Sequence, residues 1–325
     1  MRITLVHLSE SDEDAPSHIQ TAIKQIFTIS PQAQLTLVDR EATLHYTNGG
    51  ISLGKKVEPR EVFNNPHSQG FWRYCIERFY YLLAWAETHL EPQDSFFHIE
   101  NDIMVYQPIE RIEELCRGID DTTQIWATFD CDKRCIPGLI WFRNPKALRD
   151  MCIHMSTSAQ PNDMFMIGEY RQQFPNLIKA FPVIPDPKGP HGLGEYFIEF
   201  GTLFDAAAIG QYMGGTFRGP KMFVPPFDFS FPYDIGFENE TSAFLVKAFK
   251  ICWKQKGDLW FPFAGEIPIA NLHIHSKQLS MFQSSHFSFY QKWKRTLQYA
   301  IRWDQPVPPI IPCIKEYFCG SEDSS

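Results

Sequence analysis

Two acidic residues interrupt one of the most apolar stretches of the chain. The segment Phe96 to Tyr106 reads FFHIENDIMVY, in which Glu100 and Asp102 follow a hydrophobic run and are separated by Asn101. An ionised carboxylate in apolar surroundings is costly unless it has a partner. Hard cations such as Mg²⁺ and Mn²⁺ prefer oxygen ligands and are often held by one or two carboxylates. The pattern indicates a divalent-metal site at a strand end; the alternative is a polar turn in which Asp102 caps a backbone donor.

A second group of potential ligands lies far along the chain, in the segment NLHIHSK that contains His273, His275 and Lys277. Alternate residues of a strand share one face, so both histidines can point to the same side. A neutral imidazole nitrogen is a common metal ligand. The alternative is that one or both rings are packed and hydrogen-bonded in the core, and the sequence leaves open which histidine faces a cleft.

The first forty residues predict the element that would position a bound ligand. Ile3 to Leu8 reads as a strand, the apolar spacing from Ile19 to Phe27 as a helix, and Leu35 to Val38 as a second strand that ends at Asp39. Such a βαβ unit builds a parallel sheet, and open sheets of this kind bind ligands at the carboxyl ends of their strands. We therefore expect the loop after Leu8 and the region of Asp39 to contribute to a binding site.

The remaining elements continue this α/β pattern. Apolar residues at spacings of three and four predict a helix over Phe71 to Leu90, which ends before Pro92 and leads into the strand that carries the acids. Further predicted elements are strands at Ile125–Phe129 and Gly138–Phe142, helices at Pro145–Met155 and Met164–Phe174, and a strand at Ile267–Ile274. A basic helical pattern at 291–302 and a Pro-rich stretch at 306–312 form the C-terminal part.

Composition excludes several classes of protein. The 325 residues carry a net charge of −8 and contain no Lys/Arg-rich block, which argues against a nucleic-acid partner. No apolar run reaches the roughly 18 residues needed to span a bilayer, and the N-terminus lacks a signal-peptide pattern. Eight cysteines without a CxxC pair indicate reduced thiols. We expect a cytoplasmic protein, unless it is exported without a signal peptide.

Known motifs of other enzyme classes are missing from the sequence. It contains no Gly-rich phosphate loop followed by Lys, no G-x-S-x-G elbow, no HExxH and no protein-kinase signature. These absences argue against nucleotidyltransferase, serine hydrolase, zincin and kinase functions.

In their order along the chain, the motifs resemble those of the GT-A glycosyltransferase superfamily over residues 1 to 278. Its members place a D-x-D motif at a strand end after a βαβ nucleotide-binding half, and here the motif is Glu100-Asn101-Asp102, with Glu in the first position. The resemblance implies an α/β, Rossmann-like fold with a mostly parallel central sheet flanked by helices. It also implies a nucleotide-sugar-binding half at 1–106, an acceptor-side half at 107–278 and a helical, Pro-rich extension at 279–325.

The resemblance also implies roles for the residues around the motif. Asp102 would bind a Mn²⁺ or Mg²⁺ ion, Glu100 would bind the metal or the ribose, and His273 or His275 would complete the metal ligands. Lys277 would meet the diphosphate. Gly138, in CIPGLIWFRN, would let substrate approach the backbone, and the segment FDAAAIGQY would line the site.

Donor binding would fall to the region of Leu8, to Asp39 and to Arg78 on the long helix. The alternative for Arg78 is a surface ion pair with Glu77 or Glu87.

An inverting reaction would require an acid that takes the proton of the acceptor hydroxyl. Asp163, at the start of a predicted helix, is the first candidate, and its alternative role is to cap that helix. Asp205 and Asp132 are the other candidates.

The implied function is metal-dependent transfer of a sugar from a nucleotide-sugar donor, with UDP-sugars favoured, to an unidentified acceptor hydroxyl. The acceptor class is open: it could be a glycan, a lipid, a small molecule or a protein. Two alternatives remain. One is a catalytically inactive carbohydrate- or nucleotide-binding protein of the same fold, and the other is a metal-dependent nucleotide-sugar hydrolase.

Overall fold

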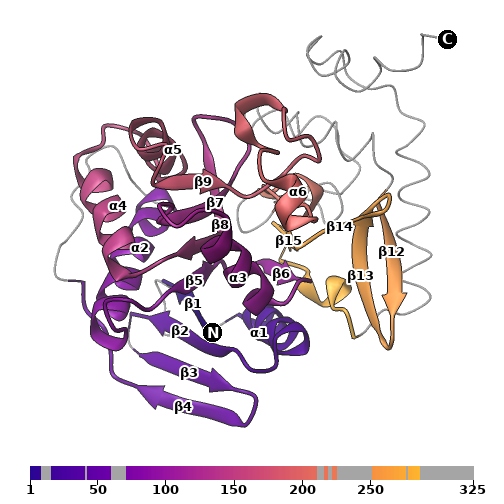
Figure 1. Ribbon diagram of the computed structural model, residues 1–325. Helices are drawn as coiled ribbons and strands as arrows, with labels where there is room; N and C mark the ends of the chain where they lie inside the picture. The colour runs from indigo at the N-terminus through magenta and orange to yellow at the C-terminus, as the bar shows by residue number, and fades with distance from the viewer. Residues whose placement is uncertain are drawn as a thin grey trace.

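An eight-stranded sheet forms the centre of the molecule (Figure 1). The computed structural model describes residues 1–8, 16–40, 42–59, 71–210, 216–218, 222–224, 251–275 and 277–285. The predicted helix at 291–302 and the Pro-rich stretch at 306–312 lie outside these residues. The eight strands are β1 (Arg2–His7), β2 (Gln34–Asp39), β3 (Thr43–Thr47), β4 (Gly50–Gly54), β5 (Phe96–Ile99), β7 (Ile125–Phe129), β8 (Cys135–Phe142) and β9 (Ile178–Ala180).

The strands are arranged in the order β4-β3-β2-β1-β5-β8-β7-β9. Strand β1 is parallel to β2 and β5, and β7 is parallel to β9, whereas the other neighbouring pairs are antiparallel. It follows that only β3 and β8 run against the common direction. The prediction of an α/β fold with a mostly parallel central sheet flanked by helices is confirmed.

Helices cover both faces of this sheet (Figure 1). One apolar core lies between the sheet and helices α2, α4 and α5, and a second lies between the sheet and helices α1, α3 and α6. The helices are α1 (Ser17–Ile29), α2 (Phe71–His89), α3 (Ile109–Ile119), α4 (Pro145–Thr157), α5 (Asp163–Gln173) and α6 (Phe197–Phe200), with short 3₁₀ turns η1 (Pro190–Gly192) and η3 (Leu279–Phe282). Because helices bury both faces, the central strands read as continuous apolar runs.

The predicted elements of the first half agree with the structure. β1, α1 and β2 form the expected βαβ unit, and α2 ends at His89, two residues before the turn that leads into β5. None of the helices in the described residues has both the length and the apolar composition of a membrane-spanning segment.

Three smaller sheets lie outside the central sheet in the described part of the chain. Strand β6 (Ile103–Val105) pairs with β15 (Asn271–His273), and the hairpin of β12 (Ile251–Lys256) and β13 (Leu259–Ala264) continues into β14 (Ile267–Pro268). Strands β10 (Thr216–Arg218) and β11 (Met222–Val224) form a further pair. The single strand predicted over Ile267–Ile274 is wrong: the segment forms β14 and β15, which pair with β13 and β6 respectively.

Candidate functional site

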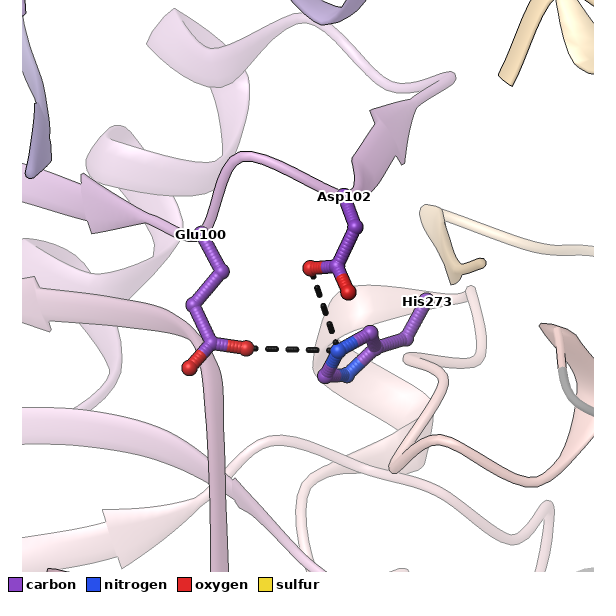
Figure 2. Close-up of side chains that lie close together, drawn as sticks. All are labelled: Glu100, Asp102 and His273. Carbon is purple, nitrogen blue, oxygen red and sulfur yellow. Dashed lines mark ion pairs between the residues drawn. The ribbon is translucent and has the colours of Figure 1, made fainter. Parts of the chain in front are cut away.

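Glu100, Asp102 and His273 converge just beyond the end of β5 (Figure 2). Nε2 of His273 lies 3.2 Å from Oε2 of Glu100 and 3.2 Å from Oδ1 of Asp102. One ligand atom from each of the three residues lies within 4.8 Å of the others. Asp102 and His273 are buried, and Glu100 is partly exposed. Two carboxylates and one imidazole directed at a common point are a donor set that could hold a divalent metal ion.

The backbone places the two acids on either side of this point. The amide of Glu100 donates to the carbonyl of Gly138 over 2.9 Å, so Glu100 continues the pairing of β5 with β8 by one residue. The amide of Ile103 then donates to the carbonyl of Glu100 over 3.2 Å, which closes a turn around Asn101 and Asp102. This turn, between β5 and β6, brings both carboxylates to the carboxyl end of the central strands.

A short antiparallel ladder carries His273 to the acids. In the pairing of β6 with β15, His273 stands opposite Ile103, and the amide of Ile274 donates to the carbonyl of Asp102 over 2.9 Å. Of the two histidines proposed as ligands, the structure therefore brings His273 to the acids. The ring of His275 lies beside that of His273, with 4.5 Å between centroids, and is not part of the three-residue group found among the described residues.

Gly138 and Gly210 allow the close approach of His273. A Cβ at position 138 would lie 2.9 Å from Nδ1 of His273 and 2.7 Å from Cδ1 of Ile103, and a Cβ at position 210 would lie 2.0 Å from the carbonyl oxygen of His273. Glycine is needed at both places because a side chain has no room. The expectation that Gly138 admits substrate to the backbone is wrong, since the His273 ring fills that space.

Replacing Gly138 with Ala is expected to weaken metal binding about tenfold, because the added methyl displaces the His273 ring from the two carboxylates. Titration calorimetry with Mn²⁺ would measure the change. Gly118→Ala, in α3, is a matched control because a Cβ there has no neighbour within 4 Å. An unchanged affinity in Gly138→Ala would show that the ring position does not matter for the metal.

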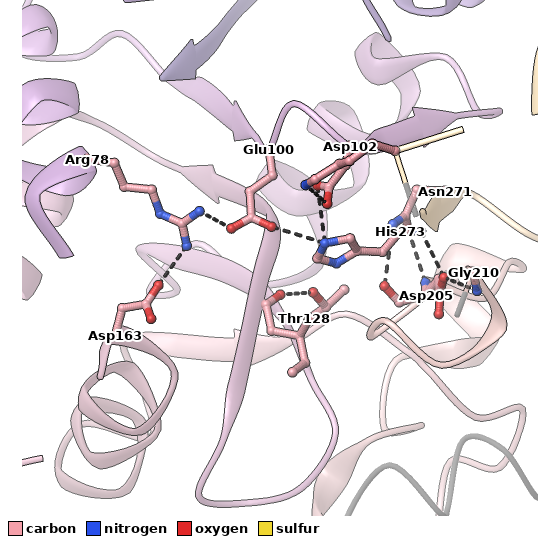
Figure 3. Close-up of polar contacts among 11 residues, drawn as sticks. Arg78, Glu100, Asp102, Thr128, Asp163, Asp205, Gly210, Asn271 and His273 are labelled. Carbon is pink, nitrogen blue, oxygen red and sulfur yellow. Dashed lines mark hydrogen bonds and ion pairs between the residues drawn. The ribbon is translucent and has the colours of Figure 1, made fainter. Parts of the chain in front are cut away.

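Two cations, Lys277 and Arg78, flank the acids, and Figure 3 shows Arg78 between Glu100 and Asp163. Nζ of Lys277 forms an ion pair with Oδ2 of Asp102. On the other side, Arg78 from α2 forms ion pairs with Glu100 through Nη1 and with Oδ2 of Asp163 through Nη2, the latter over 2.6 Å. Arg78 therefore lies in the site rather than in the alternative surface pair with Glu77 or Glu87.

These neighbours determine the protonation of the acids. Burial alone would raise the pKa of Asp102, but the charges of His273 and Lys277 hold it well below its usual range. Burial likewise opposes ionisation of Glu100, and Arg78 together with His273 lowers its pKa. Burial and the charge of His273 lower the pKa of His275 to about 3, so this ring is neutral at physiological pH. Both acids are ionised, as metal ligands must be.

Asp163 occupies the first turn of α5 but does not cap it. The cap is Asn162, whose Oδ1 accepts from the amide of Phe165 over 3.2 Å. The Asp163 side chain is almost fully buried, and its Oδ1 has no hydrogen-bond partner in the described part of the chain. Burial raises the pKa of Asp163, against the lowering effect of Arg78.

Asp205 is engaged by the backbone. Its Oδ1 accepts from the amides of Ala208 and Ile209, each over 2.8 Å, and its Oδ2 accepts from Gly210 over 2.7 Å and from His273 over 2.9 Å (Figure 3). The carboxylate thus fixes the loop after residue 205 to the strand that carries His273. Asp132, the third candidate acid, is half-exposed and pairs with His191 over 3.6 Å.

The residues expected to bind a donor lie at neighbouring strand ends. Asp39 ends β2 opposite His7, the last residue of β1, and Leu8 follows directly and packs against the core. The sequence prediction did not include His7 and His18, although both flank the loop expected to bind a ligand. Nδ2 of Asn101 lies 3.3 Å from Nδ1 of His7.

No protein-family model matches the chain, and no curated protein matches its sequence. Solved structures that resemble it include mouse xyloside xylosyltransferase 1 in its apo form, with 9% identity over 56% of this chain and 84% of that one. They also include apo GlyE from Streptococcus pneumoniae TIGR4, with 10% identity over 55% and 44% of the two chains. The galactosyltransferase LgtC, solved with donor and acceptor sugar analogues, has 11% identity over 56% and 73%. Each TM-score is 0.37. These three proteins are glycosyltransferases, the class that the sequence motifs resemble.

Proposed function

We propose that this protein transfers a sugar from a nucleotide-sugar donor, a UDP-sugar by preference, to an acceptor hydroxyl with the help of a divalent metal. The observation that carries the proposal is the convergence of Glu100, Asp102 and His273, with Lys277 beside them, at the carboxyl end of a mostly parallel sheet. Ligands of open α/β sheets bind at this end.

Asp102, His273 and Glu100 would hold the metal. When bound, the ion stabilises the negative charge that develops on the leaving diphosphate. Lys277 lies at the open side of the group, with a side chain 42% exposed, so its ammonium can turn from Asp102 to a diphosphate oxygen. The chain's own contribution is to keep both carboxylates ionised and the imidazole oriented before the donor arrives.

The two candidate catalytic acids then take different roles. Asp205 orients the backbone of His273, because backbone amides engage both of its carboxylate oxygens. Asp163 is the better candidate for contact with a substrate hydroxyl, since its Oδ1 has no partner among the described residues and burial raises its pKa. Arg78 holds Asp163 and Glu100 at a fixed separation.

The nucleotide would lie over the ends of β1 and β2, near Leu8 and Asp39. His7 and His18 flank this region, and His7 contacts Asn101, the central residue of the acidic motif. Donor binding and metal binding would therefore be coupled through one turn of the backbone.

Thermal unfolding tests the proposal. We expect one nucleotide among UDP, GDP and CDP to raise the melting temperature of the protein in Mn²⁺ but not in its absence, because a ligand that binds only the folded state stabilises it. Asp102→Asn should abolish this shift, and Asp132→Asn, in a half-exposed loop, should retain it.

A second measurement, the release of sugar from the donor when no acceptor is present, distinguishes a transferase from a hydrolase. Sugar released from the donor without an acceptor would favour the hydrolase alternative. If no nucleotide or nucleotide sugar shifts the melting temperature with any metal, the acids are structural and the proposed function is wrong.

A further inference from the structure

Strand β4 (Gly50–Gly54) forms an edge of the central sheet that is open among the described residues (Figure 1). Its inner side pairs with β3, and no described strand pairs with its outer side. The strand has the sequence GISLG. The side chains of its two large apolar residues, Ile51 and Leu53, are 63% and 74% exposed. Natural sheets usually protect such an edge with a charged residue, a proline or a bulge. Strand β4 has no charge and no proline.

The hairpin geometry fixes which backbone groups of β4 point outward. Strands β3 and β4 are joined by Asn48 and Gly49, and Thr47 pairs with Gly50 next to this two-residue turn. In a turn of this kind the flanking pair is hydrogen-bonded, and hydrogen-bonded and non-hydrogen-bonded pairs then alternate along the ladder. The amides and carbonyls of Gly50, Ser52 and Gly54 therefore face β3. Those of Ile51 and Leu53 face away from the sheet.

This outward pattern is self-complementary. If a second β4 lies antiparallel with Ser52 opposite Ser52, then Ile51 of each copy stands opposite Leu53 of the other, and each such pair can exchange both hydrogen bonds. A shift by one residue would oppose outward-facing groups to inward-facing ones. A shift that centres the pairing on Ile51 would place Leu53 opposite Gly49, which offers no side chain.

The side chains fit the same register. Ile51 stands beside Tyr46 and Leu53 beside Leu44 in the β3–β4 ladder. Tyr46 belongs to the core under α1, and the partly buried Leu44 packs against that core. In the symmetric pair, Ile51 and Leu53 of both copies lie on one face and continue that apolar row. Cross-strand apolar pairs of this kind stabilise a sheet.

Charge also favours the antiparallel pair. Lys55 and Lys56 follow β4, and the symmetric register places Lys55 opposite Gly49 of the other copy. The two Lys55 residues then lie about six residues, or roughly 20 Å, apart along the strands, which exceeds the Debye length at physiological salt. A parallel pair would bring the same lysines side by side.

We propose that β4 pairs with β4 of a second copy of this chain in the register centred on Ser52, so that two sheets join into one. The contact is short compared with a standard interface of about 1,200–2,000 Å². We therefore expect a dimer that forms reversibly as the protein concentration rises. This interface lies on the chain apart from the site of the proposed function and does not depend on it.

Cysteine cross-linking tests the register. In the proposed pair the two Ser52 residues form a non-hydrogen-bonded pair with a Cα separation of about 4.5 Å, which a disulfide can span. Under mild oxidation, Ser52→Cys is expected to give a covalent dimer above the background of the wild-type cysteines. Lys55→Cys, whose copies lie far apart in this register, should remain at that background. Equal cross-linking at both positions would overturn the register.

Sedimentation velocity tests the dimer itself, from low to high micromolar protein. The double variant Ile51→Lys/Leu53→Lys should raise the dissociation constant at least about tenfold, because it places like charges opposite each other. Ile198→Lys, at a site 76% exposed, is the control and should leave association unchanged. Mixing the lysine variant with Ile51→Glu/Leu53→Glu should restore dimers. A wild-type chain that stays monomeric, or a dimer that the edge variants leave intact, would overturn the proposal.

Discussion

Replacing Asp205 with Ala is expected to lower the free energy of unfolding by about 4 kcal/mol or more. The substitution leaves the amides of Ala208, Ile209, Gly210 and His273 without their acceptor in a buried site. Each buried donor that loses its partner costs about 1–3 kcal/mol, and water that enters the vacated space recovers part of this. A loss of this size is a large fraction of the stability of a typical domain. Denaturant unfolding followed by fluorescence would measure it.

The control is Asp132→Ala, which removes a half-exposed carboxylate that pairs only loosely with His191. Its effect should stay within about 0.5 kcal/mol. If Asp205→Ala fails to fold, Asp205→Asn gives the same test, because the amide keeps one acceptor oxygen and should fall between wild type and complete loss. An Asp205→Asn variant as stable as the wild type would contradict the assigned role.

The first half of the fold could be predicted because its elements are strongly patterned. Strands β1 and β5 are continuous apolar runs, and α2 repeats apolar residues every three or four positions. The hairpin of β3 and β4 was missed, although Asn48-Gly49 between LHY and ISL is a strong hairpin signal. Helix α3 was also missed, because most of its residues are polar. Only one narrow face, which includes Ile109, Ile112 and Cys116, is buried against the core.

The site could be predicted only where its chemistry is local. Glu100 and Asp102 are separated by one residue, so the acid pair is visible in the sequence. The contact between Asp102 and Lys277, by contrast, joins positions 175 residues apart, and it depends on the pairing of β6 with β15. Sequence reasoning could name two histidines there, but only the ladder register decides that His273 faces the acids.

The roles of Arg78 and Asp205 show a further limit of the sequence. The sequence placed Arg78 on a helix and offered it as a donor-binding residue or as a surface ion-pair partner, whereas its partners in the structure are Glu100, just after β5, and Asp163 at the start of α5. Asp205 was a candidate for proton transfer because an acid near a site has that chemistry. Its actual partners are backbone amides, and no pattern of side chains in a sequence records where those amides point.

Arg78→Met is expected to destabilise the metal-free protein at pH 7 by about 3–5 kcal/mol. Arg78 is buried between Glu100 and Asp163, and the exposed fractions of the three side chains are 12%, 15% and 2%. Methionine has a similar length but removes the cation beside the buried carboxylate of Asp163 and the partly buried carboxylate of Glu100. Removing one partner of a buried ion pair is costly because the other charge stays in the protein interior. Denaturant unfolding at pH 7 measures the loss. Arg73→Met, which removes an exposed pair with Glu77 on the same helix, should cost at most about 1 kcal/mol.

Lowering the pH should narrow the difference in the free energy of unfolding between Arg78→Met and the wild type. Burial already raises the pKa of Asp163, and it rises further without Arg78, so the folded variant binds a proton more tightly than the unfolded chain. The variant therefore gains stability as pH falls from 7 toward the ordinary range of a carboxyl group. In the wild type, Arg78 lowers the pKa of Glu100, and the stability this provides is lost as pH falls through that lowered value. The unfolding free energies of the variant and the wild type should therefore converge as the pH is lowered from 7 to about 4. A difference that stays constant over this range would mean that Arg78→Met loses stability through packing and not through the carboxylates.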